Sequence, residues 1–133
     1  MLIVLDTNVI VSGLINPHGA PARLIDLLLS TAVQLAYDDR ILAEYEEVLS
    51  RPVFGFSTRD IDALLDHIRL FGLAALVADS PLRDCPDPSD LPFAEVALAS
   101  HADALVTGNA AHFDFLRRWG VRVVAPAEFI ASL

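Results

Sequence analysis

The chain begins with an apolar run that ends in an acid, Leu2-Ile3-Val4-Leu5-Asp6. Because no polar residue alternates with the four apolar ones, the run predicts a strand buried on both faces, as in the centre of a parallel sheet. Open α/β folds keep their functional sites at the carboxyl ends of such strands. Asp6 is therefore either a site residue at that edge or the N-cap of the segment that follows, and this stretch alone does not decide.

Strands and helices alternate along the rest of the chain. Apolar runs predict further strands over residues 33–36, 73–78, 104–107 and 121–124. Helical spacing of apolar residues predicts helices over residues 22–30, 38–50, 57–70, 92–101, 111–119 and 126–130. Asp38 is expected to cap the second of these helices and Ser57 the third, with Gly72 ending the third. The alternation indicates an α/β fold with a parallel sheet between two helical layers, in a single domain spanning residues 1–133.

Composition narrows the class of protein. The chain has 133 residues, of which 54% are hydrophobic and 20% charged, so we expect a globular domain. No apolar run approaches the roughly 20 residues that span a bilayer, and the first strand is too short for a signal peptide. Cys85 is the single cysteine and has no partner for an internal disulfide. We therefore expect a cytoplasmic protein without a membrane segment.

The charge of the chain excludes several functions. The net charge is −9, and all nine basic residues are arginine. Schiff-base enzymes, P-loop proteins and phospho-receiver domains are excluded, because each of them uses a lysine and this chain has none. A haloacid-dehalogenase-like phosphatase is rejected as well, since it needs a lysine and a second acid where this chain has Asn8. The acidic balance argues against broad binding of nucleic acid, yet it permits a nuclease, because carboxylates that bind a metal ion reverse the local field.

Several polar residues are expected at the edge of the sheet that carries Asp6. Asp90 precedes a predicted helix, with Asp87 three residues before it, and Asn109 follows the fourth predicted strand. Carboxylates held close together are costly unless a cation neutralises them, and oxygen ligands of this kind suit Mg²⁺ or Mn²⁺. A glutamate from the 38–50 helix is a further candidate, and helical geometry leaves Glu44 and Glu46 equally possible.

Four segments, in this order, resemble the motifs of the PIN-domain family: Asp6 to Val9, Leu42 to Pro52, Asp87 to Phe93 and Leu105 to Phe113. They are most similar to the bacterial and archaeal branch described as toxins of type II toxin–antitoxin systems, the VapC-like ribonucleases. The resemblance covers essentially the whole chain. It implies a three-layer αβα PIN-like fold with about five parallel strands in the order 3-2-1-4-5, and a Mg²⁺- or Mn²⁺-dependent endoribonuclease.

The resemblance also implies roles for individual residues. It matches Asp6, Glu44 and Asp90 to the first three family acids, which favours Glu44 over Glu46. Asp87 is a secondary acid. The fourth acid of the family often follows Thr-Gly, and here that position is Asn109, which carries no charge and weakens the case for a second metal ion. Asp114 is a poorly aligned substitute for it.

The expected mechanism is metal-assisted phosphodiester hydrolysis. Asp6 and Asp90 would bind the metal ion, and Glu44 would help to bind it or orient the attacking water. Hydrogen bonds to these groups are expected from three polar side chains: Thr107, Asn8 and Ser12. Arg117 and Arg118, with Arg122, form the densest basic spot, which is either an ion-paired surface or a contact for RNA.

The expected partners are an RNA substrate, a cognate antitoxin protein and, through apolar helices such as 57–70, a second copy of the chain. The alternative function is a catalytically degenerate PIN-like module for binding or assembly, favoured by Asn109 and the acidic surface. Outside the site, Phe113 and Trp119 are expected in the core, Glu95 is expected to face solvent, and the histidines are interpreted as surface residues.

Overall fold

The computed structural model describes residues 1–133 and contains one five-stranded sheet in the order β3-β2-β1-β4-β5. All four strand pairs are parallel. The strands are β1 (Leu2–Leu5), β2 (Gln34–Tyr37), β3 (Leu73–Ala74), β4 (Ala104–Val106) and β5 (Val123–Val124). The expected fold class, the parallel sheet and the strand order 3-2-1-4-5 are confirmed.

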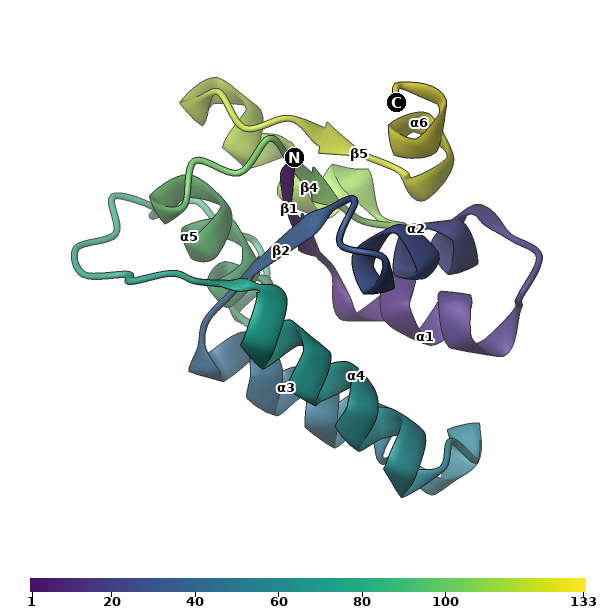
Figure 1. Cartoon of the computed structure of the whole chain (residues 1–133). Coiled ribbons are helices and arrows are strands. Elements are labelled where there is room, and N and C mark those ends of the chain that lie inside the picture. Colours follow the sequence, from purple (N-terminus) through teal and green to yellow (C-terminus); the bar gives the residue numbers. More distant parts are fainter.

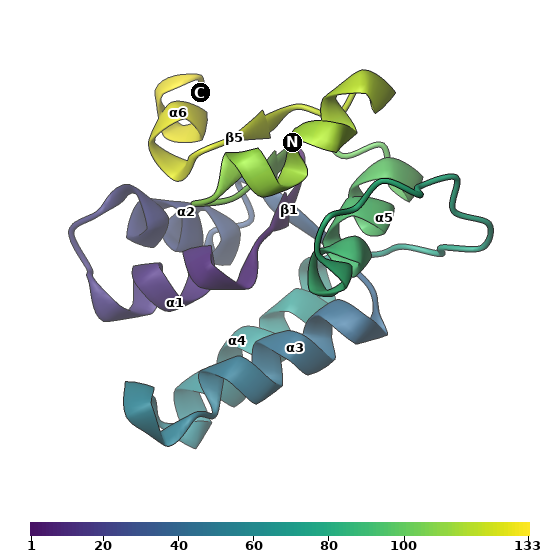
Figure 2. The same cartoon turned by 180° about the vertical axis from the view of Figure 1, so that it is seen from behind.

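Helices cover both faces of the sheet (Figures 1 and 2). They are α1 (Thr7–Ile15), α2 (Ala20–Leu29), α3 (Asp39–Leu49), α4 (Thr58–Phe71), α5 (Leu91–Ala99) and α6 (Pro126–Ala131). Helices α1, α2 and α6 lie on one side and α5 on the other, while α3 and α4 form a pair of neighbouring helices that extends away from the sheet. Three 3₁₀ segments, η1 (Pro52–Phe54), η2 (Pro88–Asp90) and η3 (Ala110–Trp119), complete the chain. No helix is long and apolar enough to cross a membrane.

The central strand β1 ends at the edge that carries the polar residues. Ile3, Val4 and Leu5 are fully buried, as the unbroken apolar run predicts. The register pairs Leu5 with Val106 of β4, and the backbone N–H of Asp6 donates to the Val106 carbonyl at 3.0 Å. Asp6 therefore follows the last residue of β1, directly beside the carboxyl end of β4.

Local capping explains the boundaries of α3 and α4. The Asp38 carboxylate accepts the backbone N–H of Ile41, and the Ser57 hydroxyl accepts that of Asp60, each at 3.1 Å. Gly72 ends α4 where the backbones of α4 and β2 come together. A Cβ atom at position 72 would lie only 2.5 Å from the Ile68 carbonyl oxygen, so glycine is required for this close approach. These three expectations are confirmed.

The structure differs from the sequence-based expectations at several elements. Strand β3 has two residues instead of six, because no backbone hydrogen bond joins the chain to β2 beyond the Ala75 N–H, which donates to the Tyr37 carbonyl at 2.7 Å. Residues 7–15, for which no helix was expected, form α1, and the expected helix over 111–119 is a 3₁₀ segment. Phe113 is buried as expected, but the expectation for Trp119 is wrong, since it is 43% exposed.

The expectation that Glu95 faces solvent is also wrong. Glu95 lies on α5, is buried, and its Oε1 atom accepts from Nη1 of Arg40 at 2.7 Å. Arg40 also pairs with Asp38 at 2.8 Å. A buried carboxylate is retained only where such a partner compensates its lost hydration. The ion pair therefore joins the beginning of α3 to α5.

Candidate functional site

A pocket of about 280 Å³ lies at the carboxyl edge of the sheet and is lined by acids from three separate parts of the chain. Asp6 comes from the end of β1, Glu44 from α3 and Asp90 from the segment before α5. The remaining lining residues are Thr7, Asn8, Val48, Arg51, Asp87, Ser89, Asn109 and His112. We call this cavity the acidic pocket. The fold thus brings together all three acids that the sequence singles out.

Asp6 occupies the N-cap position of α1, yet its side chain makes no capping hydrogen bond. Its Oδ2 atom instead accepts from the hydroxyl of Thr107 at 2.8 Å. Burial raises the pKa of the Asp6 carboxyl, and the Thr107 hydrogen bond opposes that shift. The capping interpretation of Asp6 is therefore wrong, and its carboxylate is oriented from β4 toward the acidic pocket.

Asp90 shows the same feature at the start of α5. It occupies the N-cap position without capping, and its buried Oδ2 atom has no hydrogen-bond partner. Nδ1 of His112 lies 3.6 Å from this oxygen, which is too long for a hydrogen bond. Burial raises the pKa of Asp90, and the neighbouring carboxylates of Asp6, Asp87 and Glu44 raise it further. A bound cation would compensate both the missing hydrogen bond of this buried oxygen and the repulsion between the neighbouring carboxylates.

Glu44 lines the acidic pocket, whereas Glu46 is exposed and does not. A short hydrogen bond from the Thr7 hydroxyl to Oε2 of Glu44 connects α1 to α3. Beside it, the buried hydroxyl of Tyr45 donates to the Leu5 carbonyl at 2.6 Å, which anchors α3 to the end of β1. The choice between the two glutamates therefore depends on how α3 is rotated against β1.

The rim of the acidic pocket holds residues of mixed charge. Asp87 is exposed and accepts the backbone N–H and the hydroxyl of Ser89, each at 2.9 Å, which lowers the pKa of its carboxyl. Nδ2 of Asn109 lies 3.2 and 3.1 Å from the two ring nitrogens of His112. Arg51 also lines the acidic pocket and forms an ion pair with Glu47. The rim thus offers hydrogen-bond donors next to the acids.

Other residues singled out in the sequence lie elsewhere. Thr107 is buried and does not itself line the acidic pocket, but it contacts two residues that do, Asp6 and Asn109. Ser12 lines a neighbouring cavity together with Asn8. Arg117 donates to the Val123 carbonyl at 2.9 Å, and Arg118 pairs with Asp84, so neither arginine reaches the acids.

The fourth-acid position has no carboxylate substitute in the structure. Asp114 does not line the acidic pocket and pairs with Arg117 at 3.5 Å. The interpretation of Asp114 as a replacement for the missing acid is therefore not supported by its position. The acidic pocket contains four acids, Asp6, Glu44, Asp87 and Asp90, with the amide of Asn109 beside them.

Five residues that line the acidic pocket are not among the site residues predicted from the sequence: Thr7, Val48, Arg51, Ser89 and His112. Thr7 carries a signal in its place directly after Asp6, since the first turn of a helix at a strand end faces the same edge. His112 follows Asn109 by three residues, which places both on one side of the 3₁₀ segment. Arg51 has no local signal, because only the end of α3 relative to the sheet brings it to the acids.

The donor set fits a divalent cation that keeps part of its hydration shell. No three His, Cys, Asp or Glu side chains converge closely enough to hold a metal ion by themselves. Mg²⁺ is commonly bound through one or two carboxylates, with water and substrate oxygens completing the shell. The carboxylates of Asp6 and Asp90, of which Asp90 has an unpartnered buried oxygen, match this requirement.

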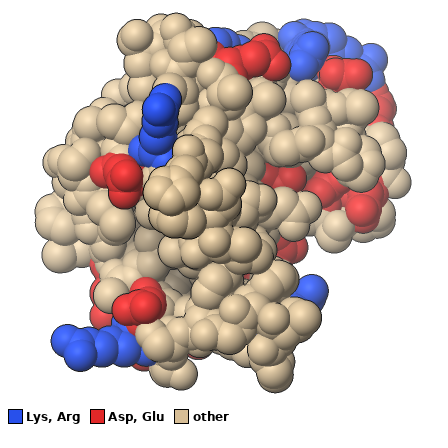
Figure 3. All heavy atoms as spheres, turned by 90° about the vertical axis from the view of Figure 1, so that its right-hand side faces the viewer, with Lys and Arg blue, Asp and Glu red and all other residues tan.

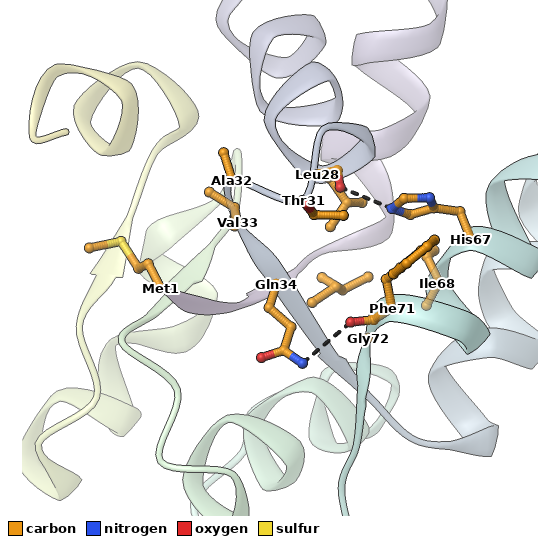
Figure 4. Close-up of a pocket in the computed structure, with 11 residues that line it drawn as sticks. Met1, Leu28, Thr31, Ala32, Val33, Gln34, His67, Ile68, Phe71 and Gly72 are labelled. Atoms are coloured by element: carbon orange, nitrogen blue, oxygen red, sulfur yellow. Dashed lines mark hydrogen bonds between the residues drawn. The ribbon is translucent and has the colours of Figure 1, made fainter.

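A separate cavity of about 330 Å³ lies at the opposite edge, by the amino ends of β1 and β2 (Figure 4). In it, Nε2 of His67 lies 3.0 Å from the Leu28 carbonyl oxygen, and Nε2 of Gln34 donates to the Phe71 carbonyl at 3.3 Å. No carboxylate lines this cavity. It therefore offers no chemistry comparable to that of the acidic pocket.

Comparison with known proteins agrees with the fold and the motifs. The chain is 28% identical over 109 residues to the uncharacterized protein MJ1680 of Methanocaldococcus jannaschii, which covers 80% of this chain and 70% of that protein. The crystal structure of VapBC2 from Rickettsia felis bound to a DNA fragment from their promoter matches with a TM-score of 0.55 and 21% identity, over 94% of this chain and 98% of that one. That structural likeness supports the fold.

The most extensive sequence match is to a family model. The model is described as a PIN domain, and it matches residues 2–111. That range contains Asp6, Glu44, Asp90 and Asn109 and ends just before His112. Because the match spans most of the sequence, the chain belongs to the PIN-domain family.

Proposed function

We propose that the protein is a Mg²⁺- or Mn²⁺-dependent endoribonuclease that hydrolyses phosphodiester bonds of RNA. One observation carries this proposal: Asp6 and Asp90 both stand at helix N-caps without capping, and Asp90 keeps a buried oxygen that has no partner. A protein keeps such costly groups where their charge is used. Membership of the PIN-domain family supports a nuclease activity.

The three acids Asp6, Glu44 and Asp90 have specific roles in this proposal. Asp6 and Asp90 hold the cation, and the Thr107 hydroxyl fixes the orientation of the Asp6 carboxylate. Glu44, held by Thr7, orients the attacking water toward the phosphate. A cation bound there would supply a lowered pKa to that water and would stabilise the negative charge that develops on the phosphate.

Residues on the rim complete the proposed site. Arg51 and His112 offer N–H donors to the phosphate oxygens of RNA, which would otherwise be repelled by the acids. Asn109 brings no charge to the fourth-acid position, so one tightly held cation is expected instead of two. Arg117 and Arg118 do not line the acidic pocket, so any RNA contact they make lies outside it.

We further propose that the nuclease is the toxin of a toxin–antitoxin pair and that it works in the cytoplasm. The structure of VapBC2 from Rickettsia felis supports this proposal, since the structural match covers 94% of this chain and 98% of that one. In this proposal a cognate antitoxin holds the protein inactive, and the active form is a homodimer. Growth arrest on expression that is abolished by Asp6→Ala, and relieved by a neighbouring gene, would test the pairing.

The ribonuclease is tested with purified protein and single-stranded RNA. We expect cleavage with Mn²⁺ or Mg²⁺, no cleavage with EDTA, and a loss of about 10²-fold or more in Asp6→Asn and Asp90→Asn. Asp62→Asn, an exposed acid on α4, is the matched control and should cleave normally. Cleavage by Asp6→Asn at the wild-type rate would overturn the proposal.

The second candidate function is a catalytically degenerate binding module, which the amide at Asn109 favours. Calorimetric titration with Mn²⁺ separates the two functions. A nuclease binds Mn²⁺ through Asp6 and Asp90, so the heat of binding is lost in Asp6→Asn and in Asp90→Asn. A module without metal affinity shows no heat that depends on either residue.

A further inference from the structure

A second cavity of about 280 Å³ adjoins the acidic pocket, and we call it the side pocket. Asn8 lines both cavities. The dipeptide after β4 forms a second shared boundary, since Gly108 lines the side pocket and Asn109 lines the acidic pocket. The two cavities therefore meet along two segments that are remote in sequence.

Close packing of three helices forms the walls of the side pocket. A Cβ atom at Gly13 of α1 would lie 2.4 Å from Cδ1 of Ile25 and 2.8 Å from the Pro21 carbonyl oxygen, so α1 and α2 pack closely because position 13 is glycine. The first turn of α6, which begins at Pro126, closes the third side. Figures 1 and 2 show α1, α2 and α6 on the same face of the sheet.

The chemistry of the side pocket contrasts with that of its neighbour. None of its nine lining residues is charged, whereas four acids line the acidic pocket. Its polar side chains include the exposed amide of Asn8 and the exposed hydroxyl of Ser12, one helical turn apart on α1. Most of the remaining wall is small and apolar, as at Ala20 and Ala127. Figure 3, which views the side of the molecule that carries α1, α2 and α6, shows mostly uncharged surface with separate acidic and basic patches at several places around it.

We propose that the side pocket binds the nucleobase of a nucleotide next to the scissile phosphate. This inference rests on the proposed ribonuclease function. In single-stranded RNA a base is joined to its phosphate through one ribose, so a phosphate held at the acids brings the base to an adjoining cavity. An uncharged, small-residue wall accepts the flat face of the base, and Asn8 and Ser12 offer donors and acceptors for its edge.

The first test fills the side pocket from α6. Ala127→Phe adds bulk at an exposed lining position, and Ala131→Phe adds the same bulk one turn further along α6, outside the pocket. After the cleavage site of one RNA is mapped, abasic nucleotides replace the flanking ones in turn. We expect one abasic position to lower kcat/KM of the wild type by about fivefold or more. Ala127→Phe should show a similar loss on intact RNA and no further loss on the abasic RNA, whereas Ala131→Phe behaves as wild type.

The second test does not depend on cleavage. Amide NMR spectra of Glu44→Gln, in which cleavage is slowed, are recorded in the presence of Mg²⁺ with an RNA trinucleotide and with ribose 5-phosphate. The proposal predicts shift changes at Ser12 and Ala127 with the trinucleotide and none with the sugar phosphate. If the wild type does not cleave RNA but these base-dependent shifts are seen, the proposed ribonuclease function is wrong and the proposed base binding in the side pocket is supported. RNA cleavage with no base-dependent shift, and equal activity of Ala127→Phe and Ala131→Phe, would overturn the side pocket alone.

Discussion

The hydroxyl of Thr107 donates a hydrogen bond of 2.8 Å to Oδ2 of Asp6, linking the ends of two adjacent strands. The same Thr107 oxygen accepts the backbone N–H of Asn109 at 3.0 Å. One buried hydroxyl therefore orients the carboxylate at the end of β1 and also fixes the turn after β4. The two sides of the acidic pocket that these strands supply are coupled through a single side chain.

Thr107→Val should remove both hydrogen bonds of the Thr107 hydroxyl and keep the packing of the side chain, because valine has nearly the same shape but no hydroxyl. We expect the free energy of unfolding to fall by about 1–3 kcal/mol, since Asp6 and the Asn109 N–H each lose a buried partner. The pKa of Asp6 should rise further, and the affinity for Mn²⁺ should fall. Urea denaturation and calorimetry measure both effects, with Thr107→Ser as the control that keeps the hydroxyl. Equal stability and metal affinity of the two variants would contradict this assignment.

Asp90→Asn should stabilise the protein while it abolishes cleavage. The folded pKa of Asp90 is raised above its ordinary value of 3.8, so the folded state binds more protons than the unfolded chain between these two values. The contribution of Asp90 to stability therefore falls as the pH rises through this window and stays low above it. At pH 7 the variant should be more stable by about 0.5–2 kcal/mol, and the difference should vanish below pH 3.8. Thermal unfolding of both proteins from pH 3 to pH 8 measures this, and a destabilised variant at pH 7 would contradict it.

Addition and removal of a divalent cation should change the stability of the wild type. An ion that binds only the folded state raises the free energy of unfolding by about 2.7 kcal/mol at a hundred times its Kd. We expect Mn²⁺ to raise Tm and EDTA to return it to the metal-free value. The Asp6→Asn, Asp90→Asn double variant should show no response. A Tm shift of the same size in the double variant would place the ion elsewhere on the protein.

Glu44→Gln and Glu46→Gln form a matched pair on one helix. Only Glu44 lines the acidic pocket and accepts from Thr7, whereas Glu46 is exposed. We expect Glu44→Gln to lower kcat for RNA cleavage by about 10²-fold and Glu46→Gln to leave it within about twofold. Steady-state kinetics on one RNA oligonucleotide distinguishes the two. A larger loss in Glu46→Gln would reverse the assignment that the rotation of α3 supports.

Arg40→Gln should destabilise the contact between α3 and α5. The substitution leaves the buried carboxylate of Glu95 without its 2.7 Å partner. Because the Arg40 side chain is 45% exposed, solvent screening limits the expected loss to roughly 1–2 kcal/mol of unfolding free energy. Glu95→Gln should cost less, since its amide oxygen still accepts from Arg40. Chemical denaturation compares the two variants, and a greater loss in Glu95→Gln would argue against this account of the pair.

Much of the fold follows from local pattern. The unbroken apolar run of Leu2 to Leu5 predicts the buried central strand, and the caps at Asp38 and Ser57 predict where α3 and α4 begin. The short edge strand β3 and the 3₁₀ form of residues 110–119 do not follow in this way. Their hydrogen bonds depend on which neighbours the folded chain supplies, and apolar residues with similar spacing are compatible with more than one such arrangement.

Part of the candidate site is predictable for the same reason. Asp6 and Asn109 each follow a parallel strand, and such strand ends share one edge of the sheet. Asp90 is predictable only from its place before a helix. Thr7 and His112 were missed although their positions after Asp6 and Asn109 carry a signal, whereas Arg51 has no local signal. Ser12 was expected to hydrogen-bond to the acids, but it lines the side pocket and not the acidic one.

The sequence by itself determined the α/β class, the position of β1 and the choice of Asp6 and Asp90 as candidate acids, because hydrophobic periodicity and residue chemistry are local properties of the chain. Helical geometry left Glu44 and Glu46 open, and only the family resemblance favoured Glu44. Only the tertiary structure decided how those acids stand toward one another. The rotation of α3, fixed by the hydrogen bond from Tyr45 to Leu5, directs Glu44 into the acidic pocket. The burial of Asp90 without a partner, and the bond from Thr107 to Asp6, arise from contacts between residues far apart in the chain. These geometries depend on the close packing of many side chains from distant parts of the chain, so they cannot be predicted from local sequence patterns.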